Sequence, residues 1–122
     1  MSIHPDYYTR LDPEPWDVML ELNLNPIEGF ALKYLARAGR KPEVSFQEDV
    51  LKAITCFERL MDDSKTQGWT LGKMRIPEEE RIATILTRWQ LGAGLDTAIY
   101  HLLLREYENA KDCALAALRE DE

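Results

Sequence analysis

A short stretch of this chain carries an excess of basic side chains, although the 122-residue protein has a net charge of −7. Residues 26–41 contain the single acid Glu28 and four bases, a local charge of +3. The bases are Lys33, Arg37, Arg40 and Lys41. Arginine binds phosphate through paired hydrogen bonds and lysine binds it as a point charge. The pattern predicts a phosphate site, but it also fits cations that stabilise a helix C-terminus and pair with the protein's own acids.

More polar residues follow at the start of the next predicted helix. Glu48 and Asp49 are adjacent, and Lys52 lies one turn later. A carboxylate pair of this kind binds Mg²⁺ together with a substrate phosphate in many phosphate-handling sites. Glu48 is equally well explained as the partner of Ser45 in a capping box. Near the N-terminus, Tyr8 either offers a surface on which a base stacks or anchors the N-terminal arm to the core.

The common phosphate and metal motifs do not occur in the sequence. There is no G-x-x-x-x-G-K-[ST] loop, G-x-G-x-x-G turn or G-x-S-x-G elbow. His4 and His101 have no partner at the spacing of metal ligands. Cys56 and Cys113 lie in amphipathic patterns without C-x-x-C spacing, so we expect buried thiols rather than a disulfide or a zinc site. The ordinary phosphate-binding motifs are therefore absent.

Composition narrows the class of protein. Hydrophobic residues make up 45% and charged residues 30% of the chain, which is typical of a globular domain. The negative net charge disfavours nucleic acid as a partner, because a polyphosphate backbone would be repelled. No stretch approaches the roughly 20 apolar residues of a membrane span, and residues 1–10 lack the apolar core of a signal peptide. We therefore expect a cytoplasmic protein with no membrane partner.

The elements that position these residues are all predicted to be helices. Pro26 and Gly39 delimit the helix of the basic cluster, and Ser45 caps the next one. Apolar residues recur at three- and four-residue spacing, and no segment alternates as a strand would. The predicted helices cover residues 14–22, 26–38, 46–61, 77–90 and, from a cap at Asp96, about 97–118. The fold class is all-α, with about five helices and a long C-terminal helical hairpin.

These helices are expected to form one domain with two parts. Residues 1–66 form the part that contains the basic cluster, and residues 67–122 form a helical hairpin on the same core. The small residues Ala110, Ala114 and Ala117 let another helix approach closely, either within the chain or in a second copy. Gly29 likewise indicates a close approach to its backbone, by a neighbouring helix or by a ligand. A homo-oligomer is one expected consequence.

Three segments resemble a known family. They are E-P-W-D-V at 14–18, E-G-F-A-L-K-Y-L-A-R-A-G-R-K at 28–41 and E-D-V-L-K-A at 48–53. Together they are similar, over about residues 5–61, to a small bacteriophage domain family that includes the nucleotide kinase of short-tailed coliphages. The chain departs from that pattern at Phe30, where the family has asparagine, and at Ala36, where it has tryptophan. Tyr7 and Tyr8 stand in place of the family's H-Y pair.

The resemblance implies a nucleotide-binding protein, with deoxynucleoside monophosphate kinase as its most specific form. Such an enzyme transfers phosphate from a nucleoside triphosphate, works as an oligomer and lacks a Walker loop; if phage-encoded, it acts in the host cytoplasm. Arg37 and Asp49 are then the expected catalytic residues, and Mg²⁺ is the candidate cofactor. The expected phosphate- or nucleotide-binding residues are Lys33, Arg37, Arg40, Lys41, Lys52 and Tyr8. Two alternatives remain: a non-catalytic oligomer that sequesters nucleotides or cyclic nucleotide messengers, and a ligand-free interaction protein.

Overall fold

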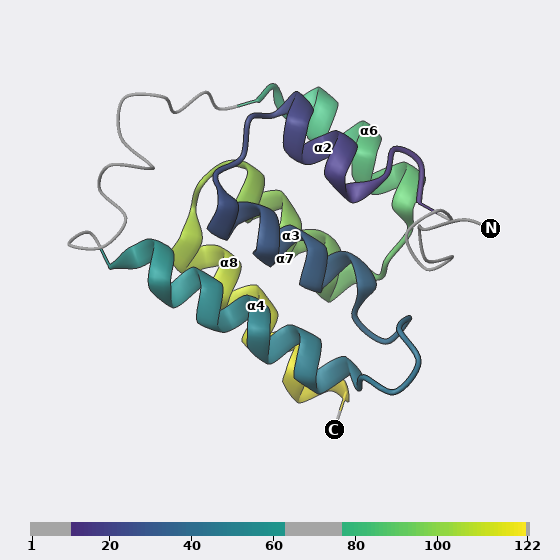
Figure 1. The fold of residues 1–122 in the computed structure, drawn as a ribbon, viewed down its shortest axis with the longest axis vertical. Coiled ribbons are helices and arrows are strands. Elements are labelled where there is room, and N and C mark those ends of the chain that lie inside the picture. Colours follow the sequence, from purple (N-terminus) through teal and green to yellow (C-terminus); the bar gives the residue numbers. More distant parts are fainter. Residues whose placement is uncertain (1–10, 63–76, 122) are drawn as a thin grey trace.

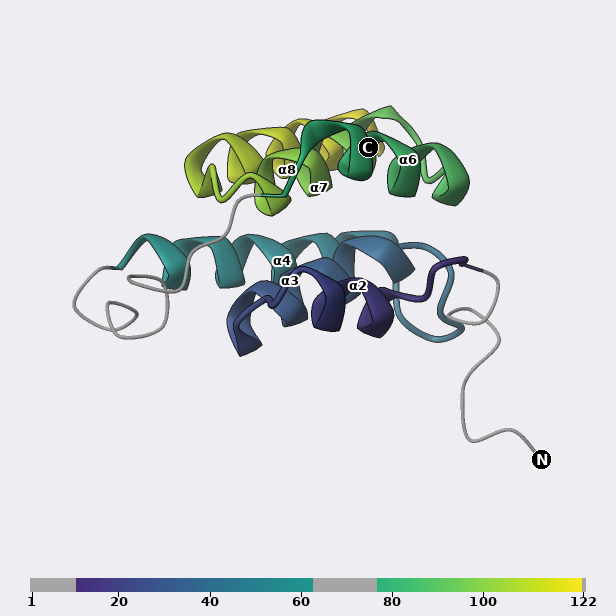
Figure 2. The ribbon, with the colours of Figure 1, turned by 90° about the horizontal axis from the view of Figure 1, so that it is seen from above.

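Six helices in two layers make up the regular structure of the described residues (Figures 1 and 2). The structure, a computed structural model, describes residues 11–62 and 77–121. One layer contains α2 (Pro15–Glu21), α3 (Pro26–Arg37) and α4 (Phe46–Met61). The other contains α6 (Glu79–Trp89), α7 (Ala93–Leu103) and α8 (Tyr107–Asp121). These helices confirm the predicted all-α class.

The two layers lie face to face, with α3 over α7 and α4 over α8 (Figure 2). Residues from both layers form a single apolar core between them. Its fully buried side chains include Leu32 and Leu35 from α3, Phe57 from α4 and Ile99 from α7. Among the described residues, no helix combines the length and apolar character needed to span a membrane.

The predicted helix boundaries follow from local chemistry in the first layer. The Asn25 side chain accepts a hydrogen bond from the Glu28 amide at the start of α3, with Pro26 in the first turn. The Ser45 hydroxyl accepts from the Glu48 amide in the same way at the start of α4. Gly39, just after α3, has a φ of 79°, which glycine adopts without steric cost. The helix that carries Lys33 and Arg37 is therefore fixed at both ends.

The prediction of one long C-terminal helix is wrong. The chain leaves the helix after Leu103 and begins a new one at Tyr107. Arg105 takes a left-handed conformation with φ 60°, and the amide of Glu106 donates to the carbonyl of His101. The apolar spacing continues across this break because α7 and α8 turn their apolar faces to the same core, so the pattern alone gave no sign of a reversal.

The start of α7 also differs from the expectation. Gly92 rather than Asp96 is the N-cap, and Asp96 lies in the first turn. The Asp96 carboxylate instead accepts a hydrogen bond from the backbone of Leu91, and burial raises the pKa of this carboxyl group. Gly94, which lies between the predicted helices at 77–90 and 97–118, is inside α7.

The small residues proposed as a contact surface are used inside the chain. Ala110, Ala114 and Ala117 are buried in the core, and α8 packs against α7 and α4. Gly29 has a similar explanation, because a Cβ built there would lie 3.1 Å from Met19 Sδ on α2. Both features are accounted for by close packing of helices within one chain.

Candidate functional site

Three basic side chains from two helices surround the ring of Tyr34. Lys33 Nζ lies 5.4 Å, Arg37 Cζ 5.0 Å and Lys52 Nζ 5.6 Å from the ring centroid. Lys33, Tyr34 and Arg37 belong to α3, and Lys52 to α4, which packs beside it. We call Lys33, Tyr34, Arg37 and Lys52, together with the nearby Lys41, the Tyr34 cluster. The structure thus brings together four of the predicted phosphate-binding residues.

The Tyr34 cluster continues into an exposed aromatic side chain. Lys33 Nζ also lies 5.7 Å from the ring centroid of Phe30, one turn earlier on α3. Phe30 is 47% exposed. The Lys33 ammonium therefore contacts two rings, and one of them is open to solvent.

Burial and the neighbouring charges both act on Lys33. Partial burial lowers the pKa of its ammonium group, and the positive charges of Arg37, Lys41 and Lys52 lower it further. The negative charge of Asp49 opposes them without reversing the direction. Lys33 is thus crowded by like charges that its own carboxylate neighbour does not balance.

Arg37 and Asp49, the two expected catalytic residues, form a buried ion pair. Arg37 Nε and a terminal nitrogen of the guanidinium each lie 3.1 Å from Asp49 Oδ1. The Asp49 side chain has no solvent exposure, and its Oδ2 has no hydrogen-bond partner among the described residues. The pair joins α3 to α4 and holds one member of the Tyr34 cluster, Arg37, in place. In this arrangement Arg37 contributes positive potential, while its side chain is held by Asp49.

The remaining basic residues of the candidate site form no ion pair with a carboxylate of the described residues. None of the ion pairs between described residues includes Lys33, Lys41 or Lys52. Arg40 is exposed in the connection between α3 and α4, next to Lys41. Tyr8 lies outside the described residues, so its predicted contact with a ligand stays a prediction. The Tyr34 cluster consequently has three lysine ammonium groups for which residues 11–62 and 77–121 supply no carboxylate partner.

The expected Mg²⁺ cofactor stays a prediction, because such an ion can be held by one or two carboxylates together with a substrate phosphate. No group of three or more His, Cys, Asp or Glu side chains within residues 11–62 and 77–121 is placed to hold a metal ion. Asp49 fits poorly as a ligand because it is enclosed and bound to Arg37. Glu48 is exposed at the first turn of α4. No chemical step through Mg²⁺ follows from these residues.

The structure contains a second buried charge network, which the sequence did not predict. Glu28, at the start of α3, is 1% exposed, and its Oε2 accepts hydrogen bonds from Tyr107 Oη at 2.7 Å and pairs with Arg105 Nε at 3.1 Å. Its other oxygen accepts from the Asn25 amide. The burial of Tyr107 and its bond to Glu28 raise the pKa of the phenol. No local sequence signal links residue 28 to residues 105 and 107, because the contact depends on how the two layers stack.

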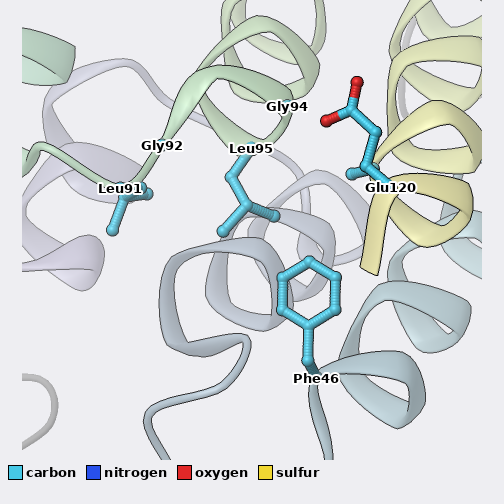
Figure 3. A pocket seen from close by; sticks show the side chains of 7 residues that line it. Phe46, Leu91, Gly92, Gly94, Leu95 and Glu120 are labelled. Atoms are coloured by element: carbon cyan, nitrogen blue, oxygen red, sulfur yellow. The ribbon is translucent and has the colours of Figure 1, made fainter. Parts of the chain in front are cut away.

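A shallow pocket of about 240 Å³ lies apart from these charges, where α4 begins and α8 ends (Figure 3). Its lining includes Phe46, Leu91, Leu95 and Ala117, and Glu120 supplies the charged group. None of the predicted site residues lines this pocket. Because its charge is negative, it does not resemble a site for phosphate.

Comparison of the chain with models of protein families, with curated proteins and with solved structures gave no match. The resemblance to the bacteriophage family therefore stays a prediction from the sequence. The candidate site is defined by its own geometry, as a group of lysines beside the ring of Tyr34 and the exposed ring of Phe30 on the α3–α4 face.

Proposed function

We propose that this protein binds nucleotides through their phosphate groups at the Tyr34 cluster. The observation that carries the proposal is the set of three lysines, Lys33, Lys41 and Lys52, that have no carboxylate partner among the described residues. Like charges placed together repel one another, which costs stability in the free protein. An anion bound between them would remove that cost. Such an anion would gain affinity from the same crowding.

The aromatic side chains favour a nucleotide over a bare phosphate. Phe30 presents an exposed ring within one helical turn of Lys33 and Tyr34. Base stacking on an aromatic side chain contributes about 1–3 kcal/mol per base and does not depend strongly on which base is present. A ligand with phosphates on the lysines and a base on Phe30 would use both features of this face.

The geometry supports binding more directly than catalysis. Asp49 is buried against Arg37 and is not placed to meet a substrate. In the proposal, the Arg37–Asp49 pair orients α3 against α4 and so keeps Lys33 close to Lys52. Phosphate transfer would need groups beyond those that the Tyr34 cluster presents, and it is supported by the family resemblance alone. Sequestration of a nucleotide would need only the binding residues.

The first test is a thermal shift with nucleotides. A ligand that binds only the folded state raises the unfolding free energy, by about 2.7 kcal/mol when its concentration is a hundred times its Kd. We expect mono-, di- and triphosphates to raise the Tm of the wild-type protein, with a smaller rise at high salt. Lys52→Met and Lys33→Met should lose most of the rise. Lys111→Met is the matched control, because Lys111 pairs with Glu58 on another surface.

The second test separates a kinase from a binding protein. The protein is incubated with labelled ATP, Mg²⁺ and each deoxynucleoside monophosphate, and diphosphate products are measured. Diphosphate formation that Lys33→Met abolishes and Lys111→Met spares would support the kinase. Thermal shifts without turnover would support sequestration. An equal Tm for wild type with and without every nucleotide would contradict the proposal and leave a ligand-free interaction protein.

A further inference from the structure

Lys33 has an environment that favours a reactive amine. It is half-buried, it lies over the rings of Phe30 and Tyr34, and its ammonium shares the Tyr34 ring with Arg37 and Lys52. A lysine that is partly desolvated beside other cations is more often found as the neutral amine, which is the nucleophilic form.

At Lys33, contacts that stabilise the ammonium compete with burial and with repulsion by neighbouring cations. An exposed cation–π contact stabilises the ammonium by only about 0.5–1 kcal/mol, and here one ring is shared by three cations. Arg37, Lys41 and Lys52 repel the ammonium, while Asp49 attracts it from α4. Burial and repulsion prevail, so the pKa of Lys33 lies below its ordinary value. From α2, the uncharged Met19 side chain lies against Gly29, one turn before Lys33 on α3.

We propose that Lys33 is a covalent modification site, where its amine forms an imine with a phosphate-bearing aldehyde whose phosphate is held by Lys41 and Lys52. The phosphate part of this inference rests on the proposed anion-binding function, whereas the reactivity of the amine does not. The neutral amine attacks the carbonyl carbon to form a carbinolamine, which expels the carbonyl oxygen as water. Amine and aldehyde give imine and water, with no oxidation or reduction.

Pyridoxal 5′-phosphate is a suitable probe, with pyridoxal as the matched aldehyde that lacks the phosphate. The folded protein is treated with either compound, the imine is trapped by borohydride, and the modified lysines are identified by peptide mass spectrometry. We expect Lys33 to be modified first, with a rate that rises at lower pH than the rate at Lys111, which is paired with Glu58. We also expect the phosphate-bearing probe to modify Lys33 about tenfold faster than pyridoxal, equivalent to about 1.4 kcal/mol.

Three variants test the reactivity of the Lys33 amine and the binding of the phosphate separately. Lys52→Met removes one repelling cation and one phosphate ligand, so it should shift the pH dependence at Lys33 upward and reduce the preference for the phosphate-bearing probe. Lys111→Met should leave both unchanged. Lys33→Arg keeps the charge and the fold but should remove the most rapidly modified position.

The outcomes distinguish a reactive amine at Lys33 from phosphate-directed binding of the aldehyde. If Lys33 reacts no faster than Lys111 with either probe, the modification site is contradicted, and the anion-binding proposal is still judged by its own thermal shifts. If Lys33 reacts rapidly but equally with both probes, the phosphate-directed site is contradicted, and the proposed nucleotide binding loses support as well. Rapid, phosphate-dependent modification at Lys33 supports the inference.

Discussion

Arg37 carries a full charge into the contact between α3 and α4, where Asp49 is its partner. Two buried charges lose their hydration, and their mutual attraction repays that loss only when the geometry is good. Here both donor distances are 3.1 Å, but Asp49 Oδ2 has no partner among the described residues. We infer that the pair specifies how α3 lies against α4 more than it adds to stability.

Arg37→Ala should therefore act on the fold before it acts on any ligand. It leaves Asp49 buried without a countercharge, and we expect the free energy of unfolding to fall by about 3–5 kcal/mol. Urea denaturation followed by circular dichroism measures this change. A loss of activity in this variant would consequently say little about catalysis.

The double variant Arg37→Met/Asp49→Leu provides the control. It removes both charges and keeps an apolar contact, so it should be considerably more stable than Arg37→Ala. The exposed Arg40→Ala should change stability by no more than about 0.5 kcal/mol. Equal destabilisation of the single and double variants would show that the side-chain volume, not the unpaired charge, is what matters.

Among the contacts between helices, the close packing of α7 against α8 depends on Gly94. A Cβ built at Gly94 would lie 2.9 Å from Ala117 Cβ and 3.3 Å from its Cα, and the second of these is backbone. Contacts of this length force the two helices apart. Gly94 therefore sets how closely the start of α7 packs against the end of α8, at the opposite end of the helix pair from the reversal at residues 104–106.

Gly94→Ala should lower the free energy of unfolding by about 1–2 kcal/mol, because overpacking outweighs the gain in helix propensity in the first turn of α7. Urea denaturation checks the value. Gly29→Ala is the matched comparison, because the Cβ added there meets only the flexible end of Met19. We expect this variant to be as stable as the wild type. A Gly94→Ala variant that is as stable as the wild type would contradict the steric explanation.

The sequence predicts elements well where local chemistry sets their ends. Pro26, Gly39 and Ser45 each mark a boundary that the structure has, because proline, positive-φ glycine and capping serine act on their immediate neighbours. The reversal around Arg105 was not predictable, since an arginine carries no turn signal and its conformation is held by the distant Glu28. For the same reason the basic cluster was visible in the sequence, but the enclosure of Arg37 by Asp49 was not.

At the scale of the whole molecule, the two layers are joined by polar contacts of two kinds. At the edge, Arg81 pairs with Glu21 and Arg88 with Asp12, and these exposed pairs each contribute about 0–1 kcal/mol. Inside, Glu28 of one layer receives hydrogen bonds and charge from Arg105 and Tyr107 of the other. The buried network is thus the polar contact that most restricts how the layers stack.

Tyr107→Phe tests this network through pH. At neutral pH the variant should lose about 1.5–3 kcal/mol of unfolding free energy, the usual contribution of a hydrogen bond to a charged group. Burial, the bond to Glu28 and its negative charge raise the pKa of Tyr107 in the folded state. Above the ordinary tyrosine pKa of about 10, the unfolded chain releases this proton while the folded protein keeps it, so wild-type stability falls as pH rises.

The difference between wild type and Tyr107→Phe isolates that effect. The lowered pKa of Lys33 gives stability the opposite pH dependence, but it is present in both proteins and cancels. We therefore expect the stability gap to be constant near neutral pH and to narrow above about pH 10, by up to about 1.4 kcal/mol per pH unit. Urea denaturation at a series of pH values measures the gap. A gap that stays the same through the alkaline range would show that Tyr107 ionises as it does in water, and that the hydroxyl is not held against Glu28 between the layers.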